Sequence, residues 1–540
     1  MTLRLVLAAV LSTCAATATF AAELPAADQP AEQVIDQVID AQLAAAGVRP
    51  APQVDDATFI RRATLDLVGR IPTPSEVDAY VKSTDPQKRE KLIDRLLASP
   101  GFARHQAAMF EVMLNPDGNR RGGDALREYL TAALRENKPW DQMFRELMLP
   151  DEADAKTKGA ADFLKARLTD ADRLTNDVSV AFFGVNVSCA QCHDHPLVKD
   201  WTQDHFYGMK SFLARTYDAG GFVAERPAGL IKFKPNKGPE RSARLMFLTG
   251  TEVKTDTLRD QTREEQQAEK LAMDKAKSSK TAPPKPAFSA RAQLVEVSLQ
   301  KGNSDFFSRA IVNRMWHRFF GLGLVNPLDQ MHSANPPSHP ELLAWLARDT
   351  AEHGYDLRRL VRGLVLSQAY SRSSRYDTAS APPAHLFAVA RLKPLTPMQL
   401  STSLRIAAAD PATFEGKHDE VEKKIEQLES SARGFASLIA QPNDNFQIGV
   451  GEALLFSNGD RVMKEFLTDG PGTLLGRMKA EKDPKAAVEL MVRSVFGRAP
   501  TADESKALVA YVEKRADRQA EAYRQVLWVL VTSPEFRFNY

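Results

Sequence analysis

The chain has 540 residues, of which 43% are hydrophobic, and its 71 lysines and arginines nearly balance 69 aspartates and glutamates. This length allows roughly two to four domains, and the apolar content supports folded cores and excludes global disorder. The formal net charge of +2 gives no bulk argument for nucleic-acid binding, so we expect no nucleic-acid partner.

Residues 1–22 have the order of a cleavable secretory signal peptide. Arg4 provides a short positive start, an apolar run follows over residues 5–11, and small residues end at Ala21-Ala22. We therefore expect an exported protein in the periplasm or at the cell surface. Residues 11–14 also resemble a lipid-attachment motif, so a lipid anchor at Cys14 is an alternative. No later segment reaches the roughly 18 consecutive apolar residues of a membrane helix, so we expect no integral span after signal removal.

Helical signals dominate residues 30–215 and 291–540. Helices are predicted over residues 31–46, 89–98, 102–114, 124–135, 140–147, 176–187, 306–320, 341–351 and 356–368. Residues 216–290 differ, because Pro and Gly interrupt the helical pattern and short strands are predicted at 230–233 and 244–248. The predicted fold class is mostly α, with two helical lobes joined by a short β-containing, Pro/Gly-rich and charged connecting segment.

The connecting segment includes a highly charged stretch, residues 259–280, followed by a Pro-rich end. Two arrangements fit this composition. One is a solvated helix and linker between the lobes, and the other is a surface helix that packs on one lobe.

A short internal similarity links the two ends of the chain. The sequence Gly-Arg-Ile-Pro-Thr-x-x-Glu at Gly69–Glu76 recurs as Gly-Arg-Ala-Pro-Thr-x-x-Glu at Gly497–Glu504. Each copy places a glycine stop before a Thr-x-x-Glu capping box, and each is followed later by a Ser-Pro turn, at Ser99 and at Ser533. Either a duplication or the stop and capping signals that many helix pairs share would produce this pattern.

The strongest chemical motif is Cys-Ala-Gln-Cys-His at residues 189–193. Once the signal peptide is removed, Cys189 and Cys192 are the only cysteines left in the chain. Two thiols at this spacing can add to the two vinyl groups of one haem, and His193 can then serve as the proximal ligand of the haem iron. The motif therefore predicts a covalent haem c held by Cys189, Cys192 and His193.

Other chemistry also fits these residues. The two thiols could form a disulfide, or they could bind a metal with two of His193, His195 and His205. A sixth haem ligand is not identified by the sequence, and the candidates are His205, His317, His332 and His339. Nearby aromatic residues would supply either an apolar wall for the haem or ordinary core packing: Trp201, Phe206, Tyr207 and Phe212.

Longer motifs resemble a known family, the planctomycete-type tandem in which a cytochrome-like domain precedes a planctomycete-specific domain, both of unknown function. The first domain is indicated by residues 59–67, 69–73, 189–196 and 201–203, and the second by residues 313–316, 320–325, 335–343, 354–357 and 533–536. The resemblance implies an exported, haem-associated protein with a role around polysaccharide breakdown and a redox partner that the sequence does not identify. Longer members carry a separate N-terminal cytochrome domain that has no counterpart in these 540 residues, so we do not expect a chain of several haems.

The sequence thus predicts an exported c-type haem protein in electron transfer or redox chemistry. Two alternatives stay open. One is a non-catalytic periplasmic or surface scaffold with a disulfide between Cys189 and Cys192. The other is a metal-dependent hydrolase that uses the Cys-His-Asp-His cluster, with His193 and His195 as ligands.

Overall fold

The structure is a computed structural model that describes residues 25–540, except residues 27, 117–123, 196–197, 236–237, 378–379 and 443–448. The predicted signal peptide, residues 1–22, and the candidate lipid anchor at Cys14 lie outside the described residues. Within the described part of the chain, no helix is both long enough and apolar enough to cross a membrane.

The mostly helical fold class is confirmed. The first helices are α1 (Ala31–Ala45), α2 (Asp56–Val68), α3 (Pro74–Lys82), α4 (Lys88–Ala98), α5 (Pro100–Leu114), α6 (Ala125–Arg135), α7 (Trp140–Met148), α8 (Ala161–Lys165), α9 (Ala171–Phe183) and α10 (Gln203–Leu213). The later helices are α12 (Ala290–Leu299), α13 (Asp305–Phe320), α14 (Pro340–Glu352), α15 (Leu357–Leu366), α16 (Pro397–Ala408), α17 (His418–Ala436), α18 (Val450–Asn458), α19 (Asp460–Phe466), α20 (Leu474–Ala480), α21 (Pro484–Phe496), α22 (Ala502–Glu513), α23 (Gln519–Thr532) and α24 (Pro534–Arg537).

The strands form four antiparallel pairs, each of only two strands. Three pairs belong to the connecting segment: β1 (Thr216–Asp218) with β2 (Val223–Glu225), β3 (Lys232–Phe233) with β4 (Arg241–Ser242), and β5 (Leu245–Met246) with β6 (Glu252–Val253). The fourth joins β7 (Lys393–Pro394) to β8 (Phe538–Asn539), so the last residues of the chain pair with a segment far away in sequence.

Most predicted helices begin and end within two residues of the prediction, but the helix predicted at 176–187 was placed wrongly. The observed helix α9 begins at Ala171, where the side chain of Asp170 accepts hydrogen bonds from two backbone N–H groups. It ends at Phe183 because Gly184 adopts a left-handed conformation with φ of 67°. Residues 185–187 therefore lie outside the helix, which leaves the segment just before the cysteine motif available for other contacts.

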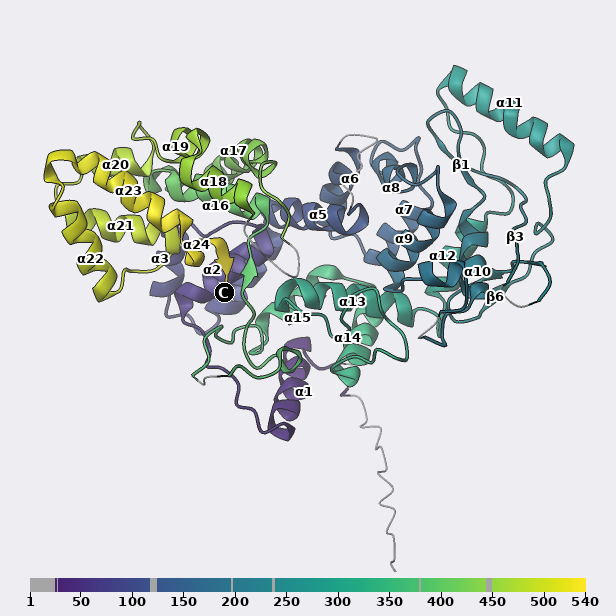
Figure 1. The fold of residues 1–540 in the computed structure, drawn as a ribbon, viewed down its shortest axis with the longest axis horizontal. Helices are drawn as coiled ribbons and strands as arrows, with labels where there is room; N and C mark the ends of the chain where they lie inside the picture. Colours follow the sequence, from purple (N-terminus) through teal and green to yellow (C-terminus); the bar gives the residue numbers. More distant parts are fainter. Residues whose placement is uncertain are drawn as a thin grey trace, which may run out of the picture.

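Two hydrophobic cores organise the molecule. The first holds apolar residues from Ala31 to Ala388 and includes α12–α15. The second holds residues from Leu395 to Phe536, together with Leu65 of α2 and Ile71. In Figure 1, α16–α24 gather at one end, the three strand pairs of the connecting segment lie at the other, and α13–α15 lie between them. The first core ends at Ala388 and the second begins at Leu395, so the apolar packing changes near residue 390. Helix α13, which is buried on nearly every side, packs with the first core.

The charged stretch of the connecting segment forms α11 (Arg263–Ser279), a helix with a single buried residue, Ala276. It lies at the edge of the molecule (Figure 1) and is held by a two-bond contact between Arg226 and Glu269. It is a surface helix against the β1–β2 hairpin, which is one of the two arrangements that the composition allowed.

The internal similarity is also a structural one. In both copies a 13-residue helix, α2 or α21, ends at a glycine with φ near 75°, at Gly69 and Gly497. In both, the arginine that follows makes a two-bond ion pair with the glutamate of the next capping box, Arg70 with Glu76 and Arg498 with Glu504.

The similarity extends into the next helices. The same four positions before the Ser-Pro turn are buried in α4 and α23: Leu92, Ile93, Leu96 and Leu97 in the first, and Val526, Leu527, Leu530 and Val531 in the second. The hydroxyl of Ser99 then caps α5, and that of Ser533 caps α24. We call residues 55–114 and 483–537 the first and second repeat units.

Candidate functional site

The predicted motif residues lie together on one exposed turn. A short 3₁₀ helix, Ser188–Gln191, carries Cys189, and Cys192 follows directly at its end. Both cysteines are exposed and neither is bonded to the other. Ala190 between them is fully buried and anchors the turn in the first core. The turn thus presents two available thiols to solvent with His193 immediately beside them.

Gln191 attaches the turn to the helices on either side. Its side-chain amide donates to Asp172 of α9 at 2.9 Å. Its backbone carbonyl accepts from the side chain of Gln203 at 3.3 Å and from the hydroxyl of Tyr207 at 3.1 Å, both on α10. The helices α9 and α10 therefore fix the backbone between the two cysteines.

The ring of His193 has a defined orientation. Its Nδ1 atom lies 2.9 Å from the backbone carbonyl of Asp194, and because a carbonyl only accepts, Nδ1 carries the proton. The other ring nitrogen, Nε2, then has a free lone pair, which is the arrangement of most metal-binding histidines. The carboxylate of Asp194 has a separate role, since it accepts from the backbone N–H of Gln203 and caps α10.

His195, the alternative metal ligand, shapes the loop that follows. Its Nδ1 atom accepts from the backbone N–H of Val198 at 3.1 Å, and its own backbone N–H donates to Trp201 at 2.9 Å. No group of three or more His, Cys, Asp or Glu residues among the described residues is arranged so that it could hold a metal ion.

The four aromatic residues near the motif have two different roles. Trp201, Phe206 and Phe212 are at most 4% exposed and pack into the first core. Tyr207 is half-buried beside the motif, where its ring stacks on Phe233 of β3 with centroids 4.1 Å apart. Burial, with the nearby Asp172 and Cys192, raises the pKa of Tyr207. Phe233 was missed by the sequence reasoning because no motif links it to residues 189–193.

The predicted sixth-ligand candidates are dispersed. His205 lies within the capping box of α10, with Nδ1 near both the N–H and the hydroxyl of Thr202. His339 is 1% exposed and packs on Phe387, where burial lowers its pKa to about 4. His317 lies in the last turn of α13. His332 lies in a loop that contacts the motif segment directly.

That loop, residues 326–335, holds the chain on both sides of the motif; we call it the clamp loop. Before the motif, the backbone N–H of Asn186 donates to the carbonyl of Asp329 at 2.8 Å, and that of Met331 donates to Gly184 at 3.1 Å. After the motif, Asp200 accepts from the N–H and the hydroxyl of Ser333 at 2.7 and 2.6 Å. Burial opposes ionisation of Asp200, but these bonds outweigh it and lower its pKa. Sequence reasoning could not find Asp329 or Ser333, because more than 130 positions separate each from its partner.

A concave region lies away from the motif. A cavity of about 370 Å³ is lined by α5, α6, α16 and α17, and His105 is part of its wall. Burial, with repulsion from Arg318 and Lys393, lowers the pKa of His105 to about 3, so its imidazole is neutral. The cavity shares no lining residue with the cysteine turn.

Two family models match the chain. One is PSCyt2, a protein of unknown function (DUF1549), over residues 34–218, and the other is PSD1, a protein of unknown function (DUF1553), over residues 290–441. No curated protein and no solved structure matches the chain. The order of the two matches confirms the predicted resemblance: the chain belongs to the planctomycete-type tandem family, in which a cytochrome-like domain precedes a planctomycete-specific domain, both of unknown function.

Proposed function

We propose that this protein is exported and carries one haem c, attached to Cys189 and Cys192, with His193 as the proximal ligand of the iron. The observation that carries the proposal is the geometry of His193: its Nδ1–H donates to the carbonyl of Asp194, so Nε2 is left to bind iron. When bound, the haem would supply one-electron redox chemistry, and the protein would act in electron transfer or a related redox reaction.

The two thiols suit this attachment. Each is exposed and unbonded, as the addition of S–H across a vinyl double bond requires. In each addition a C–S bond forms and the hydrogen ends on the neighbouring vinyl carbon, so no external oxidant or reductant is consumed. The stacked rings of Tyr207 and Phe233 give the site an apolar edge. The exposed turn leaves room for a redox partner protein to approach.

Haem content of the full-length chain, exported from a host that has a cytochrome c maturation system, tests the proposal. We expect a red protein, a pyridine haemochrome spectrum of the c type, and a mass increase of one haem that survives denaturation. The double variant Cys189→Ser, Cys192→Ser should lose the haem, whereas Ser188→Ala, an exposed change in the same turn, should keep it.

A colourless wild-type protein would contradict the proposal, and two further measurements would then separate the alternatives. A mass lower by two hydrogens before reduction, without a haem adduct, would favour the scaffold with a Cys189–Cys192 disulfide. Stoichiometric metal in elemental analysis would instead favour the metal-dependent hydrolase that uses His193 and His195.

A further inference from the structure

We infer that His332, which belongs to the second family domain, is the distal ligand of the haem iron at the motif of the first. This inference rests on the proposed function and goes beyond it, because it makes the haem site a joint product of both domains. The motif lies within the match at residues 34–218, and the whole clamp loop lies within the match at residues 290–441.

His332 is held beside the motif segment by its neighbours in the chain. The two neighbours of His332 in the chain are each fixed to the motif segment, Met331 through Gly184 before the motif and Ser333 through Asp200 after it. Met331 also packs closely on Gly184, since a Cβ atom at residue 184 would lie 2.9 Å from the sulfur. His332 is therefore fixed where the clamp loop meets the motif segment, and ordering it on binding would cost little further entropy.

The ring of His332 has one nitrogen available for a metal. The Nε2 atom of His332 lies 3.3 Å from the side-chain oxygen of Gln330, an acceptor, which places the proton on Nε2. The Nδ1 atom then has the free lone pair, and it is buried without a hydrogen-bond partner among the described residues. A buried nitrogen left in this state destabilises the folded chain, and a bound metal would offset that cost. Burial also lowers the pKa of His332, so the ring is neutral and able to ligate.

The other predicted candidates do not combine these two features. The Nδ1 atom of His205 is used in the cap of α10, and His339 is enclosed by the first core beside Phe387. His317 is on α13, outside the clamp loop. His195 follows His193 by only two residues, and its Nδ1 atom already accepts from Val198. His332 alone in this group combines an unpartnered ring nitrogen with attachment of both chain neighbours to the motif segment.

Spectroscopy of the haem-loaded, full-length protein tests the inference. We expect the ferric wild type to be six-coordinate and low-spin by absorption and electron paramagnetic resonance. His332→Ala should become high-spin and should return to low-spin when imidazole is added. His385→Ala, which removes an exposed histidine outside the clamp loop, should leave the wild-type spectrum unchanged.

His332→Met covers the case in which the alanine variant does not fold. Methionine is a common axial ligand that raises the reduction potential, so this variant should stay low-spin with a higher potential, which a purely structural role would not produce. A high-spin wild type, or a low-spin His332→Ala protein, would overturn the inference while leaving the haem proposal intact. Absence of haem from the wild type would overturn the proposed function instead.

Discussion

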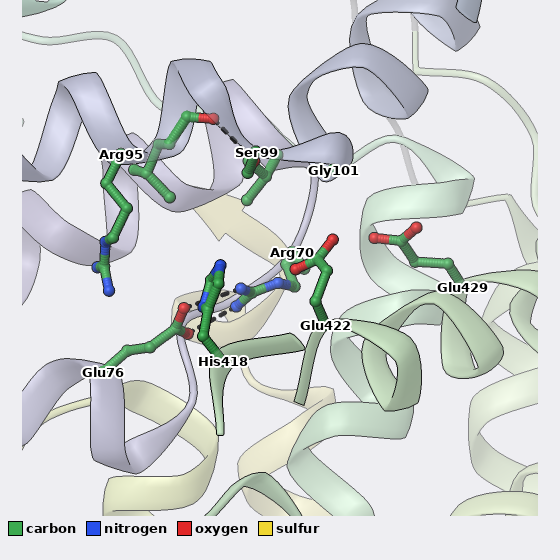
Figure 2. A pocket seen from close by; sticks show the side chains of 10 residues that line it. Arg70, Glu76, Arg95, Ser99, Gly101, His418, Glu422 and Glu429 are labelled. Atoms are coloured by element: carbon green, nitrogen blue, oxygen red, sulfur yellow. Dashed lines mark hydrogen bonds and ion pairs between the residues drawn. The ribbon is translucent and has the colours of Figure 1, made fainter. Parts of the chain in front are cut away.

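The two repeat units follow the same backbone course but lie in different surroundings. In the first, Arg70 and Glu76 are 6% and 20% exposed, and Figure 2 shows Glu422 and Glu429 of α17 approaching the same pocket. In the second, Arg498 and Glu504 are 27% and 34% exposed. The local hydrogen bonds are nearly identical, so the short sequence pattern builds the ion pair in either place.

The units also differ at one matched position after the Ser-Pro turn. The second unit has Glu535, whose carboxylate accepts two hydrogen bonds from Arg498. The first has Gly101 there, and carboxylates of α17 are nearby instead, held by Arg104 at 3.0 Å from Glu422 and 2.6 Å from Glu429. The second unit thus completes its ion pair from within, whereas the first lies against a helix of the second family match. Local sequence therefore forms the ion pair, while tertiary burial decides how much the pair contributes to stability.

Replacing Arg70 or Arg498 should give the largest difference between the two repeat units in the free energy of unfolding. Arg70→Met leaves Glu76 without its cation in a buried site, and such a loss typically costs about 3–5 kcal/mol. Arg498→Met breaks two partly exposed pairs, with Glu504 and Glu535, and should cost only about 1–2 kcal/mol in total. The free energy of unfolding from urea titration measures both. The double variant Arg70→Met, Glu76→Met is the control and should recover much of the loss, while equal losses in the two single variants would contradict the burial argument.

Alanine in place of the glycine that ends the first helix of each unit should give the next largest difference in the free energy of unfolding. Both have positive φ, so alanine costs about 1 kcal/mol of backbone strain at either position. At Gly69 the new Cβ would also lie 2.3 Å from the ring of His105, whereas at Gly497 the nearest atom, on Val77, is 3.4 Å away. We expect Gly69→Ala to lower the free energy of unfolding by about 2–4 kcal/mol in total, because overpacking adds to the strain. A loss at Gly69 no larger than that at Gly497 would show that His105 moves aside freely.

The repeat units also show which features the sequence could predict. The capping boxes and glycine stops act over at most six residues, so the helix ends at Gly69 and Gly497 could be predicted from the sequence. The cysteine motif could be recognised for the same reason, since it spans only five residues. The clamp loop was not, because Asp329 and Ser333 meet the motif segment only after the two family domains pack together. The boundary between the two cores could not be predicted from the sequence either, because it depends on which helices pack around α13 in the folded chain.

The smallest difference should be in how much stability each capping glutamate, Glu76 or Glu504, loses as the pH falls. Burial would raise the pKa of Glu76, but Arg70 and the N–H of Thr73 outweigh it and hold the pKa at about 2. Hydrogen bonds from Arg498, partly opposed by burial, hold the pKa of Glu504 at about 2 as well. A carboxyl with a lowered folded-state pKa contributes stability that is complete above its unfolded value near 4.5 and is lost as the pH falls toward 2. Glu76→Gln and Glu504→Gln should both reduce the pH dependence of the urea midpoint between pH 4.5 and 2. The change at Glu504 should be smaller and should shrink further in salt, because that pair is more exposed to solvent than the first. If Glu504→Gln changed the pH dependence as much as Glu76→Gln, and independently of salt, the more exposed Arg498–Glu504 pair would be as strong as the Arg70–Glu76 pair.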